Sequence, residues 1–234
     1  MMINSNFSIQ ARRDEEKEFG DKVNMNKTAL ETIKMFHSQR EMDDFLVSSQ
    51  ALFWKERGYE FEPLTVEECQ ELEPVLADGD ARHGVIDNDG LVGGVLCGRG
   101  LDSSGDVYQY TCNIANIARD HGVDIRCGAR VADISTSGYD GHVTHVELED
   151  GEVVTGDVFV LAAGARSGHL ARPLGVNLPV YPLRGYLVTV RPSPGVPMVT
   201  RNIYSPRHGL VSPLHPDLIR LSGGVEVRTN IFLK

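Results

Sequence analysis

The spacing of hydrophobic and polar positions changes several times along the chain, and each change marks a predicted element. The segment Leu30–Phe36 alternates like a β-strand, whereas apolar residues recur at helical spacing through Gln39–Gly58. Thr65 lies three residues before Glu68, an arrangement that predicts a capping box and a short helix ending at Pro74. The first part of the chain is therefore predicted to run from strand to helix to short helix.

The middle of the chain predicts a longer helix followed by strands. Helical spacing extends over Val107–His121, and Gly122 stands where a glycine favours the end of a helix. The dipeptide Asp150-Gly151 predicts a tight hairpin turn. Val158–Ala163 is the longest apolar run and predicts one buried strand. The full set of strand candidates here is Val123–Arg126, Ala129–Ile134, Val143–Leu148 and Val153–Ala163.

The last part of the chain is predicted to consist of strands interrupted by proline. Leu183–Val190 and Leu218–Val227 are the clearest of them, and a proline-rich turn over Pro192–Pro197 follows the first. Helices, a β-meander and further strands together predict a mixed α/β fold.

Composition restricts the class of protein. The chain has 234 residues, 41% hydrophobic and 24% charged, which suffices for one large or two small globular domains. A net charge of −10 argues against binding to nucleic acid or to an anionic membrane, so a small molecule is the expected partner. No apolar run reaches the roughly 18 residues that a transmembrane span requires.

The N-terminal residues and the cysteines bear on location. Residues 1–26 are charged and lack an apolar core, so we expect a solvated, disordered tail without a secretory or transit signal. The cysteines contain no C-x-x-C pair, which favours reduced thiols in a cytoplasmic or mitochondrial compartment. They are Cys69, Cys97, Cys112 and Cys127.

Two glycine-containing segments are candidate phosphate sites. Ala162–Gly168 follows the apolar run, and its small residues either let backbone N–H groups approach a phosphate or simply make a tight turn. Gly98–Ser103 begins like a dinucleotide fingerprint but lacks the third glycine, so we interpret it as a loop. No complete G-x-G-x-x-G or P-loop motif occurs in the sequence.

Other catalytic classes find no support. His142 and His145 would point to opposite faces of a strand, so we expect no shared metal. The motifs of zinc proteases and of serine hydrolases, H-E-x-x-H and G-x-S-x-G, are absent.

A group of arginines and tyrosines near the proline-rich strands could bind a carboxylate. An arginine fork can hold a carboxylate with two hydrogen bonds while a tyrosine closes over it, although solvated surface positions explain the same residues. The residues are Arg184, Tyr186, Tyr204 and Arg207.

The order of these motifs resembles the FAD-dependent D-amino-acid oxidase superfamily, with the D-amino-acid dehydrogenases as the nearest group. The segments that carry the resemblance are Gly93–Val95, Ser104–Asp106, Gly122–Ile125, Val131–Ile134, Val158–Ala165 and Leu178–Tyr186. The resemblance implies FAD as cofactor and an amino acid or amine as substrate, with hydride passing from its α-carbon to the flavin. The alternatives are sarcosine or glycine as substrate, or a non-catalytic binding module.

The resemblance also implies a domain plan. Residues 101–177 would form part of a Rossmann-like FAD-binding domain, and residues 27–100 and 178–234 would form a β-rich substrate domain. In the family, a G-x-G-x-x-G segment comes first and another glycine-rich flavin segment comes last. Neither is found here, so we expect an internal fragment, truncated at both ends.

Individual residues are assigned by the same resemblance. Val131 would contact the adenine of FAD, and the turn Ala163, Gly164 and Ala165 would pass close to its ribose and pyrophosphate. Arg184 and Tyr186 would act on the substrate side as catalytic residues. Gly223–Glu226 resembles a glycine-rich strand late in the substrate domain.

Overall fold

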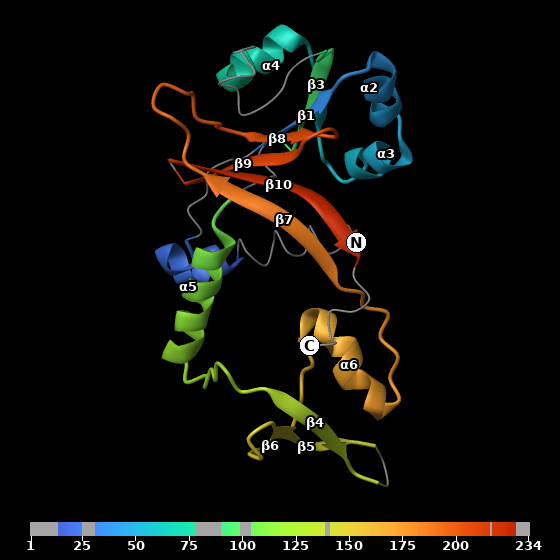
Figure 1. Ribbon diagram of the computed structural model, residues 1–234, viewed down its shortest axis with the longest axis vertical. Coiled ribbons are helices and arrows are strands. Elements are labelled where there is room, and N and C mark those ends of the chain that lie inside the picture. The colour runs from blue at the N-terminus through green and yellow to red at the C-terminus, as the bar shows by residue number, and fades with distance from the viewer. Residues whose placement is uncertain are drawn as a thin grey trace. The chain divides into compact units, whose positions relative to one another are not determined.

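The chain folds into two compact units, each with its own sheet, in a mixed α/β arrangement that confirms the predicted fold class (Figure 1). One unit consists of Met1–His121 and Gly185–Gly224, and the other of Gly122–Arg184 and Val225–Lys234. The computed structural model describes residues 14–24, 31–77, 90–98, 104–138, 141–215 and 217–227.

The first unit contains most of a seven-stranded sheet in the order β2-β3-β1-β8-β9-β10-β7. Its strands are β1 (Thr32–Phe36), β2 (Phe61–Leu64), β3 (Gly93–Cys97), β7 (Leu183–Val190), β8 (Asn202–Ser205), β9 (Gly209–His215) and β10 (Leu218–Val227). β1 pairs with β8 in parallel, whereas β1–β3, β2–β3, β8–β9 and β9–β10 are antiparallel. β7 and β10 match the predicted ranges, and β1 confirms the first predicted strand.

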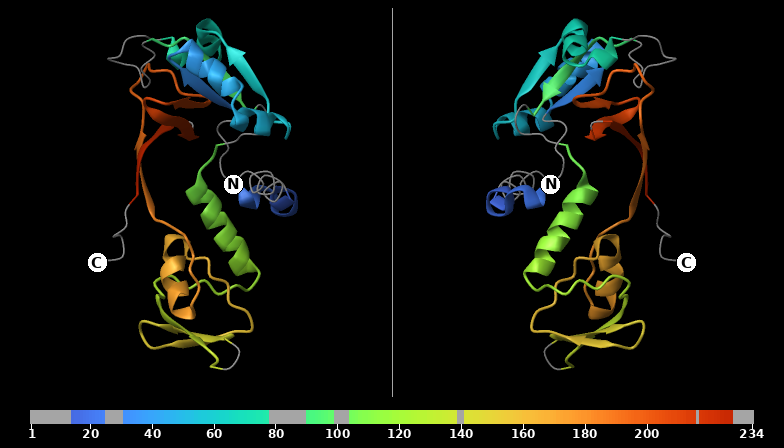
Figure 2. Two further views of the ribbon diagram at one scale, coloured as in Figure 1. Left: turned by 90° about the vertical axis from the view of Figure 1, so that its right-hand side faces the viewer. Right: turned by 90° about the vertical axis from the view of Figure 1, so that its left-hand side faces the viewer.

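Helices cover both faces of this sheet around β1 and β3. They are α2 (Gln39–Leu46), α3 (Ser49–Lys55) and α4 (Val66–Leu72), with the 3₁₀ turn η2 (Pro74–Leu76) after α4. A further helix of this unit, α5 (Val107–Asp120), packs against residues 20–23. A Cβ on Gly93 would approach Met42 of α2, while one on the adjacent Gly94 would approach Cys69 of α4. Successive residues of a strand point to opposite faces, so α2 and α4 lie on opposite sides (Figures 1 and 2).

Alternation along β1 separates two hydrophobic cores. Ile33 and Met35 are fully buried in the larger core on the α4 side. Phe36 points the other way, into a smaller core with Met42 and Val95. The period of two read from the sequence therefore produces a strand buried on both faces.

The predicted helix over Gln39–Gly58 is wrong in one respect, because the segment forms two helices. Ser48 lies between α2 and α3 with extended backbone, and its side chain accepts a hydrogen bond from the backbone N–H of Ala51. A serine that caps a helix start in this way ends the preceding helix as well. Gly58 lies beyond α3 with φ of +78°.

The other helix signals are confirmed. Thr65 and Glu68 form the predicted capping box, each side chain bonding to the other residue's backbone N–H at the start of α4. Asp106 caps α5, and Gly122 follows its end with φ of +85°.

Part of the segment expected to be a solvated tail is folded. Residues 14–19 are helical and continue into the 3₁₀ turn η1 (Gly20–Val23), in which Val23 is buried. Tyr110 of α5 donates a hydrogen bond to Glu15, and the Asn113 amide of α5 donates to the carbonyl of Asn24 at 2.7 Å. The charged residues therefore lie on an amphipathic segment that packs on α5. Residues 1–13 and 25–30 lie outside the described residues.

A buried carboxylate joins α4 to the start of β8. Glu73 is fully buried, and its two oxygens accept hydrogen bonds from the backbone N–H of Thr200 at 2.9 and 3.1 Å and from the Thr200 hydroxyl. The next residue, Arg201, donates to the Leu72 carbonyl at the end of α4 at 2.6 Å and to Glu31 at 3.0 Å. These contacts supply hydrogen-bond donors both to a backbone carbonyl at the end of α4 and to the buried Glu73 carboxylate.

The second unit is built on a three-stranded antiparallel meander in the order β4-β5-β6. Its elements are β4 (Val131–Thr136), β5 (Val143–Leu148), β6 (Val153–Thr155), η3 (Gly164–Arg166), α6 (Ser167–Ala171) and η4 (Arg172–Leu174). The hairpin predicted at Asp150-Gly151 is confirmed, with Gly151 at φ of +87°. Leu148 and Ala171 are its most buried apolar side chains among the described residues.

Two strand predictions in this unit are wrong. Val123–Arg126 forms no strand. Val158–Ala163, expected to be a buried strand, has no strand pairing, and the side chains of Val158 and Val160 are 81% and 84% exposed. Apolar spacing indicates strand tendency, but burial requires neighbours on both faces, and none of the described residues covers these two valines.

Two further predictions can be compared with the structure only over the described residues. Of the predicted loop Gly98–Ser103, only Gly98 is described, and it has φ of +71°. Among the helices that the structure describes, none is long and apolar enough to cross a membrane. The proposed FAD and substrate domain boundaries stay a prediction.

The Glu73 contacts generate a stability prediction. Glu73→Ala is expected to lower the free energy of unfolding by about 2–3 kcal/mol, because the Thr200 N–H and hydroxyl lose a charged acceptor. Glu73→Gln should lose less, since one carbonyl oxygen remains. Urea unfolding followed by circular dichroism measures both, with the exposed Glu71→Ala as matched control. Equal stability of Glu73→Ala and Glu71→Ala would contradict the prediction.

Candidate functional site

The two residues assigned to the substrate side belong to different compact units. Arg184 is exposed, and its Nη1 lies 3.7 Å from Oε1 of Glu226 within the second unit. Tyr186 is 54% exposed in the first unit, where a Cβ on Gly224 would lie 3.7 Å from its ring. Their catalytic role remains a proposal.

The residues assigned to the cofactor all lie in the second unit. Val131 is the half-buried first residue of β4, a strand at the edge of the meander. Ala163, Gly164 and Ala165 form the turn into η3, with Gly164 at φ of +56° and no heavy atom within 4 Å of a Cβ built on it. The turn is open to solvent, so its backbone is accessible to a ligand, as one of the two interpretations of this segment requires.

The remaining polar residues singled out in the sequence lie in different surroundings. Tyr204 of β8 lines a pocket, whereas Arg207 lies exposed in the turn before β9. His142 precedes β5 and His145 lies within it. No group of three metal-ligating side chains occurs in the described part of the chain.

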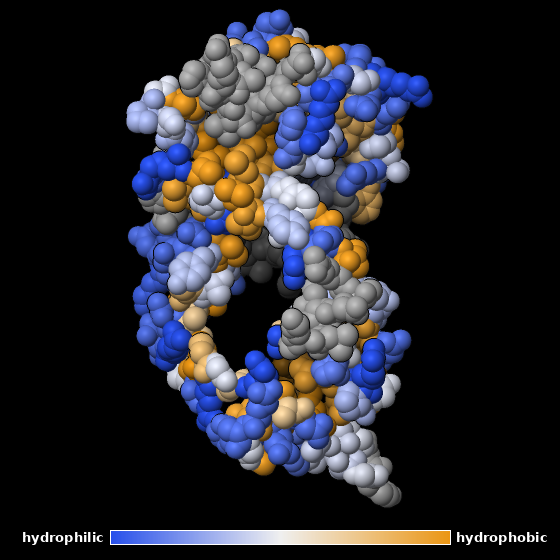
Figure 3. Space-filling view, viewed as in Figure 1, coloured by the Kyte–Doolittle hydropathy of each residue, from blue (hydrophilic) through white to orange (hydrophobic). Residues whose placement is uncertain are grey.

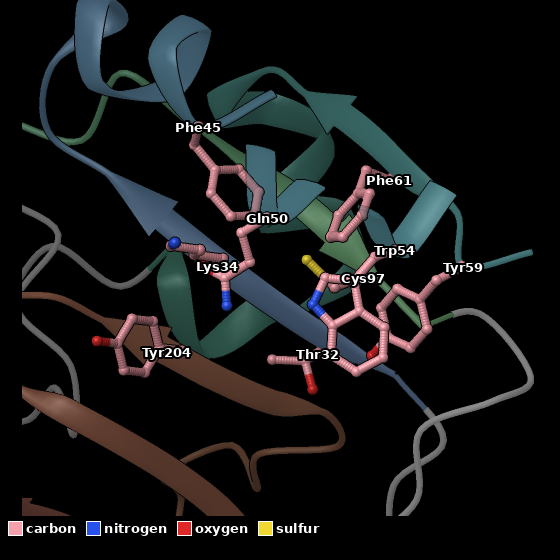
Figure 4. A pocket seen from close by; sticks show the side chains of 9 residues that line it. All are labelled: Thr32, Lys34, Phe45, Gln50, Trp54, Tyr59, Phe61, Cys97 and Tyr204. Carbon is pink, nitrogen blue, oxygen red and sulfur yellow. The ribbon is translucent and has the colours of Figure 1, made fainter. Parts of the chain in front are cut away.

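A cavity of about 220 Å³ lies in the first unit, between the sheet and the helices α2 and α3 (Figure 4). Its floor comes from β1, β2, β3 and β8, and we call it the aromatic pocket. The residues that line it are Thr32, Lys34, Phe45, Gln50, Trp54, Tyr59, Phe61, Cys97 and Tyr204.

Ring contacts make the walls of the aromatic pocket continuous. Phe45 packs against Phe61 at 5.5 Å between ring centroids, Phe61 against Tyr59 at 5.4 Å, and Tyr59 against Trp54 at 5.0 Å. These distances lie in the range in which aromatic pairs attract each other. The wall is therefore a connected aromatic surface rather than a set of isolated rings.

One ammonium group stands among these rings. Nζ of Lys34 lies 3.7 Å from the ring centroid of Phe45 and 5.8 Å from that of Tyr204, and the side chain passes between the two rings in Figure 4. Strand register sets this position, because Lys34 on β1 pairs with Tyr204 on β8. Cation–π attraction holds the charge against the rings.

Burial has opposite chemical consequences for two nearby groups. Burial lowers the pKa of Lys34 below the ordinary lysine value of 10.5, with a smaller opposing effect from Cys97. On the opposite face of the sheet, burial and then Glu68 raise the pKa of the Cys69 thiol to about 11. Cys69 is therefore a protonated core thiol and not a nucleophile.

Sequence reasoning found Tyr204 but missed the rest of the aromatic pocket. Lys34 lies within the predicted strand Leu30–Phe36, whose alternation does not indicate which side chains cover the polar positions. The signal that could have found the pocket is the concentration of aromatic residues in residues 53–61, which contain Trp54, Tyr59 and Phe61.

The lowered pKa of Lys34 predicts a pH dependence of stability. Between the lowered pKa and 10.5 the unfolded chain binds more protons than the folded chain, so the free energy of unfolding rises with pH in that window. Lys34→Met lacks this contribution. We expect the wild type to gain stability relative to Lys34→Met as the pH is raised from about 7 toward 10.5, measured by urea unfolding. A gain in the stability of the wild type relative to Lys34→Met as the pH is lowered would contradict the prediction.

Comparison with characterised sequences identifies relatives across most of the chain. It is 33% identical over 195 residues to D-amino acid dehydrogenase of Dechloromonas aromatica (strain RCB), covering 82% of this chain and 44% of that protein. The D-amino acid dehydrogenase of Methylobacterium sp. (strain 4-46) is 34% identical over 185 residues, covering 79% of this chain and 40% of that one. The chain thus spans less than half the length of these relatives.

Solved structures share the fold. Glycine oxidase from Geobacillus kaustophilus superposes with a TM-score of 0.75 at 21% identity, covering 97% of this chain and 56% of that one. L-proline dehydrogenase from P. horikoshii gives a TM-score of 0.73 at 15% identity, over 94% of this chain and 54% of that one.

The family model described as DAO, FAD dependent oxidoreductase, matches residues 7–228 and so includes nearly all the described elements of both units. The match begins at residue 7, within the segment 1–26 expected to be a solvated, disordered tail. The chain belongs to the DAO family of FAD-dependent oxidoreductases.

Proposed function

We propose that this chain belongs to an enzyme that oxidatively deaminates D-amino acids with FAD, and that it supplies one part of the cofactor site together with substrate-side residues. The observation that carries the proposal is the family match over residues 7–228, with D-amino acid dehydrogenases among the relatives. The chain spans less than half of those relatives, so the activity is proposed for the protein and not for these residues alone.

The second unit supports a partial FAD site. The turn at Ala163–Ala165 is open, and the left-handed Gly164 leaves space beside its backbone for a ligand group. Val131 lies on an edge strand, where a backbone can meet the adenine. These residues fit the adenosine side of the cofactor, while the G-x-G-x-x-G loop that cradles the pyrophosphate is absent from the sequence.

FAD, when bound, would accept the two electrons that leave the substrate α-carbon. On the substrate side we assign Arg184 to the substrate carboxylate, which its guanidinium can hold with two hydrogen bonds. Tyr186 would close over the substrate with its exposed ring and hydroxyl. The Glu226 carboxylate 3.7 Å from Arg184 would hold the guanidinium in place until substrate arrives.

A second candidate is a flavin-free binding module. The exposure of Val158 and Val160 favours it, because the run leading into the proposed cofactor turn is not packed among the described residues. The two candidates differ in whether the chain binds FAD, and a binding measurement separates them.

Glycine substitutions test the cofactor turn. Gly164→Val should weaken FAD binding about tenfold or more, because a β-branched residue resists φ of +56° and its side chain occupies the ligand space. Flavin fluorescence titration of the purified chain measures the affinity. Gly175→Val is the matched control, since Gly175 has φ of +75° and equally open surroundings at the end of η4. A folded chain that binds no FAD would reject the cofactor assignment for this chain and favour the flavin-free candidate.

A substrate panel tests the reaction class. With FAD and an artificial electron acceptor, the protein is expected to oxidise D-alanine in preference to L-alanine and sarcosine. Reduction of the acceptor, followed by absorbance, reports turnover. Oxidation of sarcosine without oxidation of D-alanine would reject the D-amino acid assignment and favour a secondary amine.

A further inference from the structure

Among the residues that line it, the aromatic pocket combines an apolar wall with a single positive charge, that of Lys34. Among the residues that the structure describes, the contacts of Lys34 Nζ are the rings of Phe36, Phe45 and Tyr204, and no carboxylate lies within ion-pair distance. Ammonium groups removed from water are ordinarily compensated by an anion. Ring faces offset only part of the lost hydration of the ammonium group.

The register of the sheet keeps this charge inside the pocket. Lys34 lies on β1 between Val95 of β3 and Tyr204 of β8, its paired residues on the two neighbouring strands. Phe45 of α2 covers the ammonium from the helix side at 3.7 Å. The lysine is therefore anchored on a central strand and cannot reach solvent as freely as a lysine on an edge or a loop.

The rest of the wall sets the shape of what fits. Trp54, Tyr59 and Phe61 form a surface of contacting, mutually tilted rings on the side of the pocket away from Tyr204 (Figure 4). A flat ring can lie against this surface while an acidic group extends to Lys34. The volume of about 220 Å³ is below the range of about 300–1,000 Å³ typical of drug-sized ligands, so the occupant is small.

We propose that the aromatic pocket binds a small carboxylic acid with an aromatic or bulky apolar body, its carboxylate paired with Lys34 and its body against Trp54, Tyr59 and Phe61. The charge of Lys34 disfavours ligands that bring a second ammonium next to it. This inference concerns the first unit alone and goes beyond the proposed function, because it requires no flavin and no turnover.

Trp54 provides a direct readout, since it is the single tryptophan of the chain and lies in the wall of the pocket. Titration of the full chain with 3-phenylpropanoate is expected to change Trp54 fluorescence saturably, with half-saturation on the order of 0.1–1 mM. The neutral analogue 3-phenyl-1-propanol and the ringless propanoate should each bind at least about tenfold more weakly. Failure of the acid to bind, or equal binding of acid and alcohol, would overturn the proposal.

Variants of Lys34 test whether its positive charge is responsible for binding the carboxylate. Lys34→Met keeps the length of the side chain and should lose at least about tenfold in affinity for 3-phenylpropanoate, while its affinity for the alcohol stays within about twofold. Lys34→Arg keeps the charge and should retain most of the acid binding. Lys55→Met removes an exposed ammonium of α3 that lines no part of this pocket and should behave as wild type.

The outcomes separate this inference from the proposed function. If Lys34→Met binds the acid as well as wild type, Lys34 has only a structural cation–π role and the proposal is wrong. Thermal unfolding monitored by circular dichroism shows whether each variant is folded, and the comparison of acid with alcohol on the wild-type chain is independent of any variant. A chain that binds the acid but no FAD would retain this site and reject the FAD site proposed for these residues.

Discussion

The structure depends on contacts between two segments that lie far apart in the sequence. β1 pairs in parallel with β8, and the buried Glu73 carboxylate accepts hydrogen bonds from Thr200, 127 positions later. A parallel pair cannot be joined by a hairpin, so the chain must return from a distance to complete the sheet. The cost of closing so long a loop is offset by burying Ile33, Ile203 and a satisfied carboxylate together.

The same pairing builds the aromatic pocket. Lys34 and Tyr204 face each other only because β1 and β8 are in register, and Phe45 covers them because Ser48 ends α2 and starts α3. A charge at the end of a flexible lysine becomes a defined feature when the strand beneath it is central and the rings above it are packed. Burial lowers the pKa of Lys34 while the ring contacts favour its charged form, and a bound carboxylate, as we propose for this pocket, would favour the charged form further.

Exposed apolar side chains mark the parts of the fold where tertiary contacts are few. Val158 and Val160 stand in solvent in the second unit, and Leu187 and Val188 of β7 are 59% and 58% exposed. Figure 3 shows hydrophobic side chains on the viewed face of the larger sheet. The matched segment covers only 44% of the D-amino acid dehydrogenase of Dechloromonas aromatica, and the proposed FAD site at Gly164 directly follows the exposed run that contains Val158 and Val160.

Local elements whose signals are contained within a few residues can be predicted from the sequence alone. Such signals include the Thr65–Glu68 capping box, Gly122 after α5 and the Asp150-Gly151 hairpin, where dihedral freedom and nearby hydrogen bonds decide the outcome. The order of motifs also indicated the FAD-dependent family. The exposure of Val158 and Val160 and the position of Lys34 among aromatic rings emerge only from tertiary contacts. Burial and strand register are set by distant neighbours, and the period of a single segment carries no information about which neighbours those are.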